Sequence, residues 1–81
     1  MKPRRTRYEI IWEILEYCIK PKRITQIIQR CNLNPNSAEK YINILLDKNL
    51  LVKEGESYKT AVNGIKFIEE IKRVYERLFL E

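Results

Sequence analysis

Four polar residues have the spacing of one side of a helix, and their side chains can form hydrogen bonds with the base edges or phosphates of DNA. They are Asn36, Ser37, Lys40 and Asn43. An asparagine amide can pair with adenine through two hydrogen bonds, and a lysine ammonium can donate to guanine or to a phosphate oxygen. The same residue types are also typical of an ordinary solvated helix face. Which interpretation holds depends on the elements that surround these residues.

A helix over residues 35–48 is predicted to carry the four side chains. Asn34 is a residue type favoured at an N-cap, and Pro35 suits the first turn, where its missing N–H has no helical partner to lose. Apolar residues then recur at i, i+4, i+7 and i+8, which builds a second, apolar face. They are Ala38, Ile42, Leu45 and Leu46.

Another helix is predicted earlier in the chain, from Arg7 to about Ile19. Its apolar residues follow the i, i+3/i+4 rule with glutamates between them. It is expected to end there because Pro21 disfavours helical backbone at the preceding residue. Residues 22–24 have the pattern of a short extended segment.

A short second helix is predicted over residues 26–31, with Thr25 as its N-cap. Asn32 tolerates left-handed backbone better than most residues, so we expect it to end this helix. A three-residue turn over residues 32–34 then leads to the helix at 35–48. The unit has the pattern of a helix-turn-helix.

A β-hairpin is predicted directly after the helix-turn-helix. Residues 50–52 and 57–60 have the pattern of two strands, and Gly55-Glu56 has that of a tight turn between them. An isolated hairpin is only marginally stable in water, so it must pack against the helices. Leu51 and Tyr58 are the side chains expected to hold it there.

The last predicted helix begins at Thr60 or Asn63 and continues to about Leu80. It carries more apolar residues than a helix at the edge of so small a domain can bury, which favours a second chain as cover. Four of its apolar residues are spaced at three, four and three, as in a short coiled-coil seam. The predicted homodimer interface consists of Ile68, Ile71, Tyr75 and Leu78.

The order of elements predicts a mainly α fold with a small β-hairpin, the winged helix-turn-helix. Residues 1–6 are expected to form a flexible basic arm and residues 7–60 the winged helix-turn-helix domain. Residues 61–81 are expected to form a C-terminal dimerisation helix that packs as part of the same domain.

Positive charge is concentrated in the first 30 residues. Residues 1–30 hold eight Lys/Arg and three Glu, whereas residues 31–81 hold eight basic and eight acidic residues. A polyanion is the natural partner of such a cluster, although solubilising surface charges are the alternative. The cations expected to contact DNA are Arg4, Arg5, Arg7, Lys20, Lys22 and Arg23.

The residue composition gives little support for a catalytic or metal-binding function. The chain has no histidine and two cysteines, fewer than the roughly four ligands of a structural zinc site, so no metal or other cofactor is expected. Without histidine or a Gly-rich phosphate loop, we expect no enzyme. Cys18 and Cys31 lie on apolar helix faces and are predicted to be buried free thiols, a disulfide being the alternative. No stretch has the composition of a membrane span or signal peptide, so a cytoplasmic protein is expected.

Two stretches resemble the small archaeal winged-helix DNA-binding proteins. They are EILEYCIKPKRITQIIQRCNLNPNSAEKYINILLDKNLL, which includes the Lys40-Tyr41 pair, and YKTAVNGIKFIEEI. The second leads from the predicted hairpin, which is the wing of the fold, into the last helix. Its matching residues are Tyr58, Lys59, Thr60, Gly64 and Phe67. Asn49, which is expected to adopt left-handed backbone after the helix at 35–48, stands where the family usually has Gly. Glu39 is acidic on the outer helix face, and the last helix is short. The resemblance implies a dimer formed through a C-terminal antiparallel coiled coil.

The sequence therefore predicts binding of double-stranded DNA, with the helix at 35–48 in the major groove. Regulation of transcription is the preferred role, and a nucleoid-associated protein is expected. Two alternatives remain open at this point. One is a general chromatin protein, and the other is a winged-helix adaptor that binds proteins and not DNA.

Overall fold

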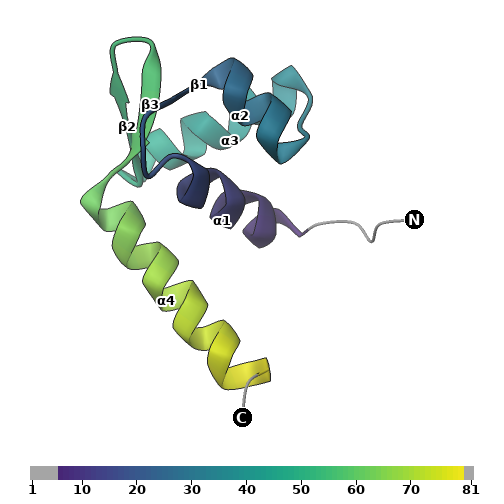
Figure 1. Ribbon diagram of the computed structural model, residues 1–81, viewed down its shortest axis with the longest axis vertical. Coiled ribbons are helices and arrows are strands. Elements are labelled where there is room, and N and C mark those ends of the chain that lie inside the picture. The colour runs from purple at the N-terminus through teal and green to yellow at the C-terminus, as the bar shows by residue number, and fades with distance from the viewer. Residues whose placement is uncertain (1–5, 80–81) are drawn as a thin grey trace.

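The computed structural model describes residues 6–79 and has the predicted winged helix-turn-helix architecture (Figure 1). Three helices pack together, a hairpin stands beside them, and the last helix runs from the base of the hairpin past the first one. The elements are α1 (Arg7–Tyr17), β1 (Lys22–Arg23), α2 (Ile24–Cys31), α3 (Pro35–Asp47), β2 (Leu51–Glu54), β3 (Ser57–Thr60) and α4 (Val62–Phe79).

Side chains close the N-terminal ends of α1 and α2. The Thr6 hydroxyl accepts from Glu9 N at 3.1 Å, and the Glu9 carboxylate accepts from Thr6 N at 3.3 Å, which forms a capping box. The expectation that Thr25 caps α2 is wrong, because the helix begins directly after β1 and Arg23 occupies the cap position. There the Gln26 amide oxygen accepts from Arg23 N at 2.9 Å.

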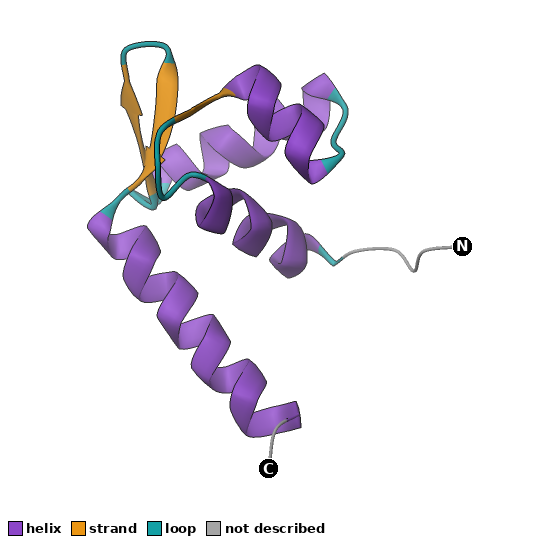
Figure 2. Cartoon of the chain, viewed as in Figure 1, coloured by secondary structure: helices purple, strands orange, loops and turns teal. Residues whose placement is uncertain are grey.

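The sheet has three strands in the order β1-β3-β2, one more than the predicted hairpin (Figure 2). The extended segment after α1 pairs with the outer edge of β3, so that Lys22 lies opposite Tyr58. Left-handed backbone occurs at Asn32 and Asn49, as the sequence predicted, with φ of 53° and 59°. Gly55 turns the hairpin with φ of 61°.

The core lies between α1, α2, α3 and the near ends of the sheet and α4. Its buried apolar residues are Ile14, Leu15, Cys18, Ile27, Cys31, Ile42, Leu45, Leu51 and Ile68. Both cysteines are free and buried, so the disulfide alternative does not describe this structure. Burial raises the pKa of the Cys18 thiol to about 12, which keeps it uncharged at neutral pH.

Thr60 joins the end of α1 to the junction between β3 and α4. Its hydroxyl donates to Leu15 O at 2.6 Å, and its backbone N–H donates to Cys18 O at 2.8 Å. The Leu15 carbonyl lies in the last turn of α1, where carbonyls lack a helical N–H partner. Thr60 is only 3% exposed, so it supplies this partner in a region closed to water.

The first turn of α4 packs closely against the same junction. Ala61 N donates to Leu50 O at 2.9 Å. A Cβ atom on Gly64 would lie 2.6 Å from the Thr60 methyl group and would also overlap the Leu50 carbonyl oxygen. Only glycine at this position lets α4 approach the hairpin so closely, and this contact sets the direction in which α4 leaves the domain.

Thr60→Val should lower the free energy of unfolding by about 1–3 kcal/mol, because it leaves the buried Leu15 carbonyl without a partner while preserving shape. Urea denaturation followed by circular dichroism measures the change. The matched control is Thr25→Val on the exposed side of α2. Equal stabilities for the two variants would contradict the role given to Thr60.

Candidate nucleic-acid interface

The start of α3 is fixed by its predicted cap. The Asn34 side-chain oxygen accepts from Ser37 N at 2.8 Å, and Pro35 occupies the first turn. Three predicted apolar positions of the helix are buried, and Leu46 packs against the core. Since this side faces the core, the rotation of the helix about its axis is set, and its polar side faces outward.

The outward side of α3 forms a shallow polar hollow. Its lining residues are Asn36, Glu39, Lys40 and Asn43. Three of the four α3 residues predicted to bind DNA therefore share one exposed surface, and the fourth, Ser37, is half-buried beside the cap. The Glu39 carboxylate is the only acidic group in this hollow. A carboxylate accepts hydrogen bonds and repels anions such as phosphate.

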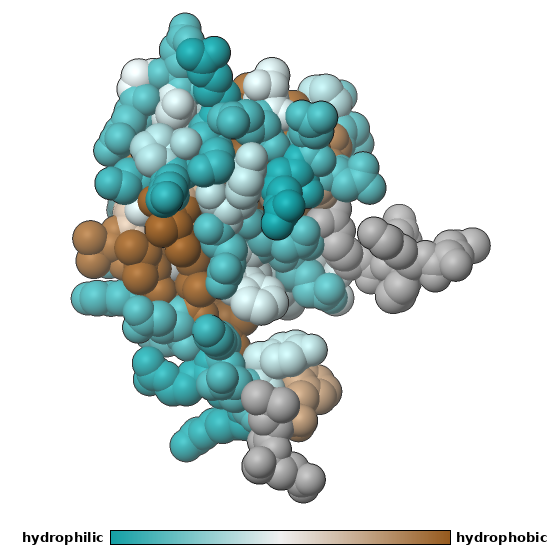
Figure 3. Space-filling view, in the orientation of Figure 1, coloured by the Kyte–Doolittle hydropathy of each residue, from teal (hydrophilic) through white to brown (hydrophobic). Residues whose placement is uncertain are grey.

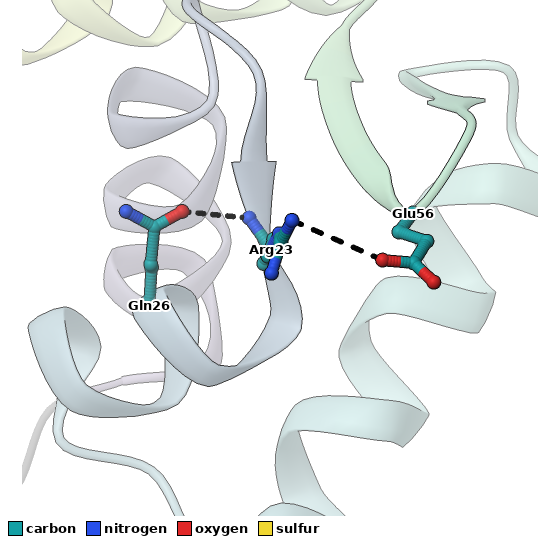
Figure 4. Close-up of polar contacts among 3 residues, drawn as sticks. All are labelled: Arg23, Gln26 and Glu56. Atoms are coloured by element: carbon teal, nitrogen blue, oxygen red, sulfur yellow. Dashed lines mark hydrogen bonds and ion pairs between the residues drawn. The ribbon is translucent and has the colours of Figure 1, made fainter.

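Arg23 lies between the start of α2 and the tip of the hairpin. Its guanidinium is 3.9 Å from the Glu56 carboxylate, and the two side chains are 67% and 86% exposed (Figure 4). An ion pair this exposed typically contributes less than about 1 kcal/mol, so it does not hold the guanidinium firmly. Arg23 is available to an anion that approaches from outside.

Lys22, although adjacent to Arg23, has a different neighbourhood. Its ammonium lies 4.9 Å from the centre of the Tyr17 ring and donates to Lys20 O at 3.3 Å. Lys20 and Lys22 line a groove between α1 and α2. Successive residues of a strand point to opposite faces, which accounts for the separation of Lys22 from Arg23.

The cations predicted to contact DNA therefore do not form one surface. Arg7 is exposed in the first turn of α1, and Arg4 and Arg5 lie outside the described residues. Arg30, which the sequence did not single out, has its guanidinium 5.7 Å from the centre of the Tyr17 ring. No local spacing links Arg30 with Tyr17, because only the packing of α1 against α2 brings them together.

Within residues 6–79 no group of three or more His, Cys, Asp or Glu side chains is placed to hold a metal ion. In the same part of the chain, every helix is too short or too polar to cross a membrane.

The chain belongs to the winged helix-turn-helix family, whose sequence model it matches over residues 4–78. Among solved structures it is similar to Sso10a-2, a DNA-binding protein from Sulfolobus solfataricus, with 28% sequence identity and a TM-score of 0.72. The match covers 93% of this chain and 86% of that one. A search of curated proteins found no match. The family resemblance drawn from the sequence is thus confirmed.

Asn34→Ala should lower the free energy of unfolding by about 1 kcal/mol, since it removes the acceptor for the first turn of α3. Asn34→Ser retains a capping oxygen and should lose only a small part of that stability. Chemical denaturation of the three proteins tests this order. If the alanine variant is as stable as the wild type, Asn34 does not stabilise the start of the helix.

Proposed function

We propose that the protein binds double-stranded DNA through α3, which enters the major groove with its N-terminal half. The observation that carries this proposal is the exposed face of Asn36, Lys40 and Asn43 on a helix whose other side is buried. A helix held in this way presents its side chains with little loss of conformational freedom on binding. The similarity to a DNA-binding protein from Sulfolobus solfataricus supports the same conclusion.

Further contacts with phosphates would then come from outside α3. Arg23 lies next to the hairpin and is only weakly held by Glu56. Such contacts position a protein on the duplex without reading its sequence. On α3, two asparagines accompany a single lysine, so hydrogen bonds to bases outnumber charge contacts there. We therefore favour a site-specific regulator of transcription over a general chromatin protein.

We further propose that the active form is a homodimer joined through α4. The second half of this helix extends beyond the rest of the domain (Figure 1). Large apolar side chains remain exposed on it, and the Tyr75 and Phe79 rings pack at a tilt of 45° with their centres 4.7 Å apart. The exposed residues are Val74, Tyr75, Leu78 and Phe79. An uncovered apolar surface of this kind is typical of a protein interface.

Packing within the domain buries one of the residues that the sequence placed in the dimer interface. Ile68, predicted to face a second chain, is 6% exposed and belongs to the core of its own chain. Ile71, Tyr75 and Phe79 line a groove with residues from the start of α1, among them Tyr8. The proposed dimer surface therefore begins at Ile71, one turn later than the sequence indicated, and includes Leu78.

Lys40→Ala combined with Arg23→Ala should weaken binding to duplex DNA about tenfold or more, because each substitution removes one contact between a cation and the DNA. Fluorescence anisotropy with a labelled duplex at constant low salt measures the affinity. The control variant, Lys66→Ala with Arg73→Ala, removes the same two residue types from exposed positions of α4. Equal affinities for the two double variants would exclude α3 and the adjacent Arg23 as the DNA-binding surface.

Tyr75→Glu combined with Leu78→Glu should convert the protein to a monomer, because burying two carboxylates in an apolar interface is strongly unfavourable. Sedimentation velocity reports the mass. Val62→Glu introduces a carboxylate at an exposed apolar position at the other end of α4 and should leave the dimer intact. A wild-type protein that sediments as a monomer would disprove the proposed dimer.

A further inference from the structure

A second group of cations lies on a face separate from the polar side of α3. Lys20, Lys22 and Arg30 line the groove between α1 and α2, and no residue of α3 or the hairpin contributes to it. In Figure 1, α1 and α2 lie toward the viewer and α3 lies behind them. The surface over α1 and α2 is mainly hydrophilic in the same view (Figure 3).

Two of these cations are held beside one aromatic ring. Lys22 Nζ lies 4.9 Å and the Arg30 guanidinium carbon 5.7 Å from the centre of the Tyr17 ring. A ring face attracts each cation, but two cations near the same ring repel each other. An anion bound beside both would remove the repulsion between them.

Neutral hydrogen-bond donors lie next to one of the two cations, Arg30. An adjoining hollow is lined by Tyr17, Gln26, Gln29 and Arg30, without an acidic residue. The Gln26 amide oxygen already accepts from Arg23 N, so its NH₂ group remains to donate outward. The acidic residues of the neighbouring groove come from α1. An anion that contacts Arg30 therefore finds its most favourable position on the α2 side of Tyr17, with Lys22 at the border with the groove.

We propose that this cluster binds a phosphate group. The Tyr17 cluster is defined as Tyr17 and Arg30, which line both hollows, with Lys22 from the groove and Gln26 and Gln29 from the adjoining hollow. A guanidinium, an ammonium and two amides offer the several donors that a tetrahedral oxyanion accepts. The phosphate belongs either to the backbone of a DNA segment or to a free nucleotide, since both present the same group. The site requires no contact from α3, so it goes beyond the function proposed above.

Titrations of ¹⁵N-labelled protein by NMR test the site with three probes: inorganic phosphate, adenosine monophosphate and a short duplex. At low salt, inorganic phosphate and adenosine monophosphate should shift the amide signals of Tyr17, Lys22 and Arg30 and leave those of Asn36 and Lys40 in place. Lys22→Gln with Arg30→Gln should raise the dissociation constant for phosphate at least tenfold. Lys66→Gln with Arg73→Gln, the matched loss of charge on α4, should leave it unchanged.

The duplex distinguishes the two sources of phosphate. If DNA is the ligand, the duplex shifts the cluster signals even in the Lys40→Ala, Arg23→Ala variant, and adding the two glutamine substitutions abolishes this binding. If a nucleotide is the ligand, adenosine monophosphate shifts these signals and the duplex does not. Cluster signals that move with none of the probes, or a Lys22→Gln, Arg30→Gln variant that binds phosphate like the wild type, would overturn the proposal. Signals from α3 report on the proposed function separately.

Discussion

The hydrogen bond from the Thr60 hydroxyl to the Leu15 carbonyl is the contact on which the arrangement of this domain depends. It joins residues 45 positions apart and closes the end of α1 with a group from the end of β3. A buried carbonyl without a partner costs about 1–3 kcal/mol, a large share of the stability of so small a domain. Because Gly64 lets α4 pack against the same point, the hairpin, α1 and α4 share one anchor.

The contacts around Thr60 and Gly64 also help to hold the candidate site in place. The hairpin follows α3 directly, and Leu50 N donates to Leu45 O at 2.9 Å after the left-handed residue Asn49. At the other end of α3, the Asn34 cap fixes the first turn. The polar face of α3 is therefore presented by a helix held at both ends and along its apolar side. Side chains on such a helix are better positioned for recognition than side chains on a loop.

Local signals in the sequence were enough to predict the order of elements, the Asn34 cap and the left-handed turns at Asn32 and Asn49. These features depend on neighbouring residues. The pairing of β1 with β3 and the hydroxyl bond of Thr60 could not be predicted, because they join segments far apart in the chain. The alternation of side chains along β1 separates Lys22 from Arg23. The packing of α1 against α2 brings Arg30 to Tyr17, which likewise could not be predicted from local spacing.

If α3 and Arg23 bind duplex DNA, the affinity must depend steeply on salt concentration, because cations that contact phosphates displace bound counterions. Affinity for a random-sequence duplex is measured by fluorescence anisotropy across a salt series. The logarithm of affinity is expected to fall linearly with the logarithm of salt concentration, with a slope of about −0.9 for each phosphate contacted. Absence of binding even at low salt would contradict the account and favour a winged-helix adaptor that binds a protein through α4.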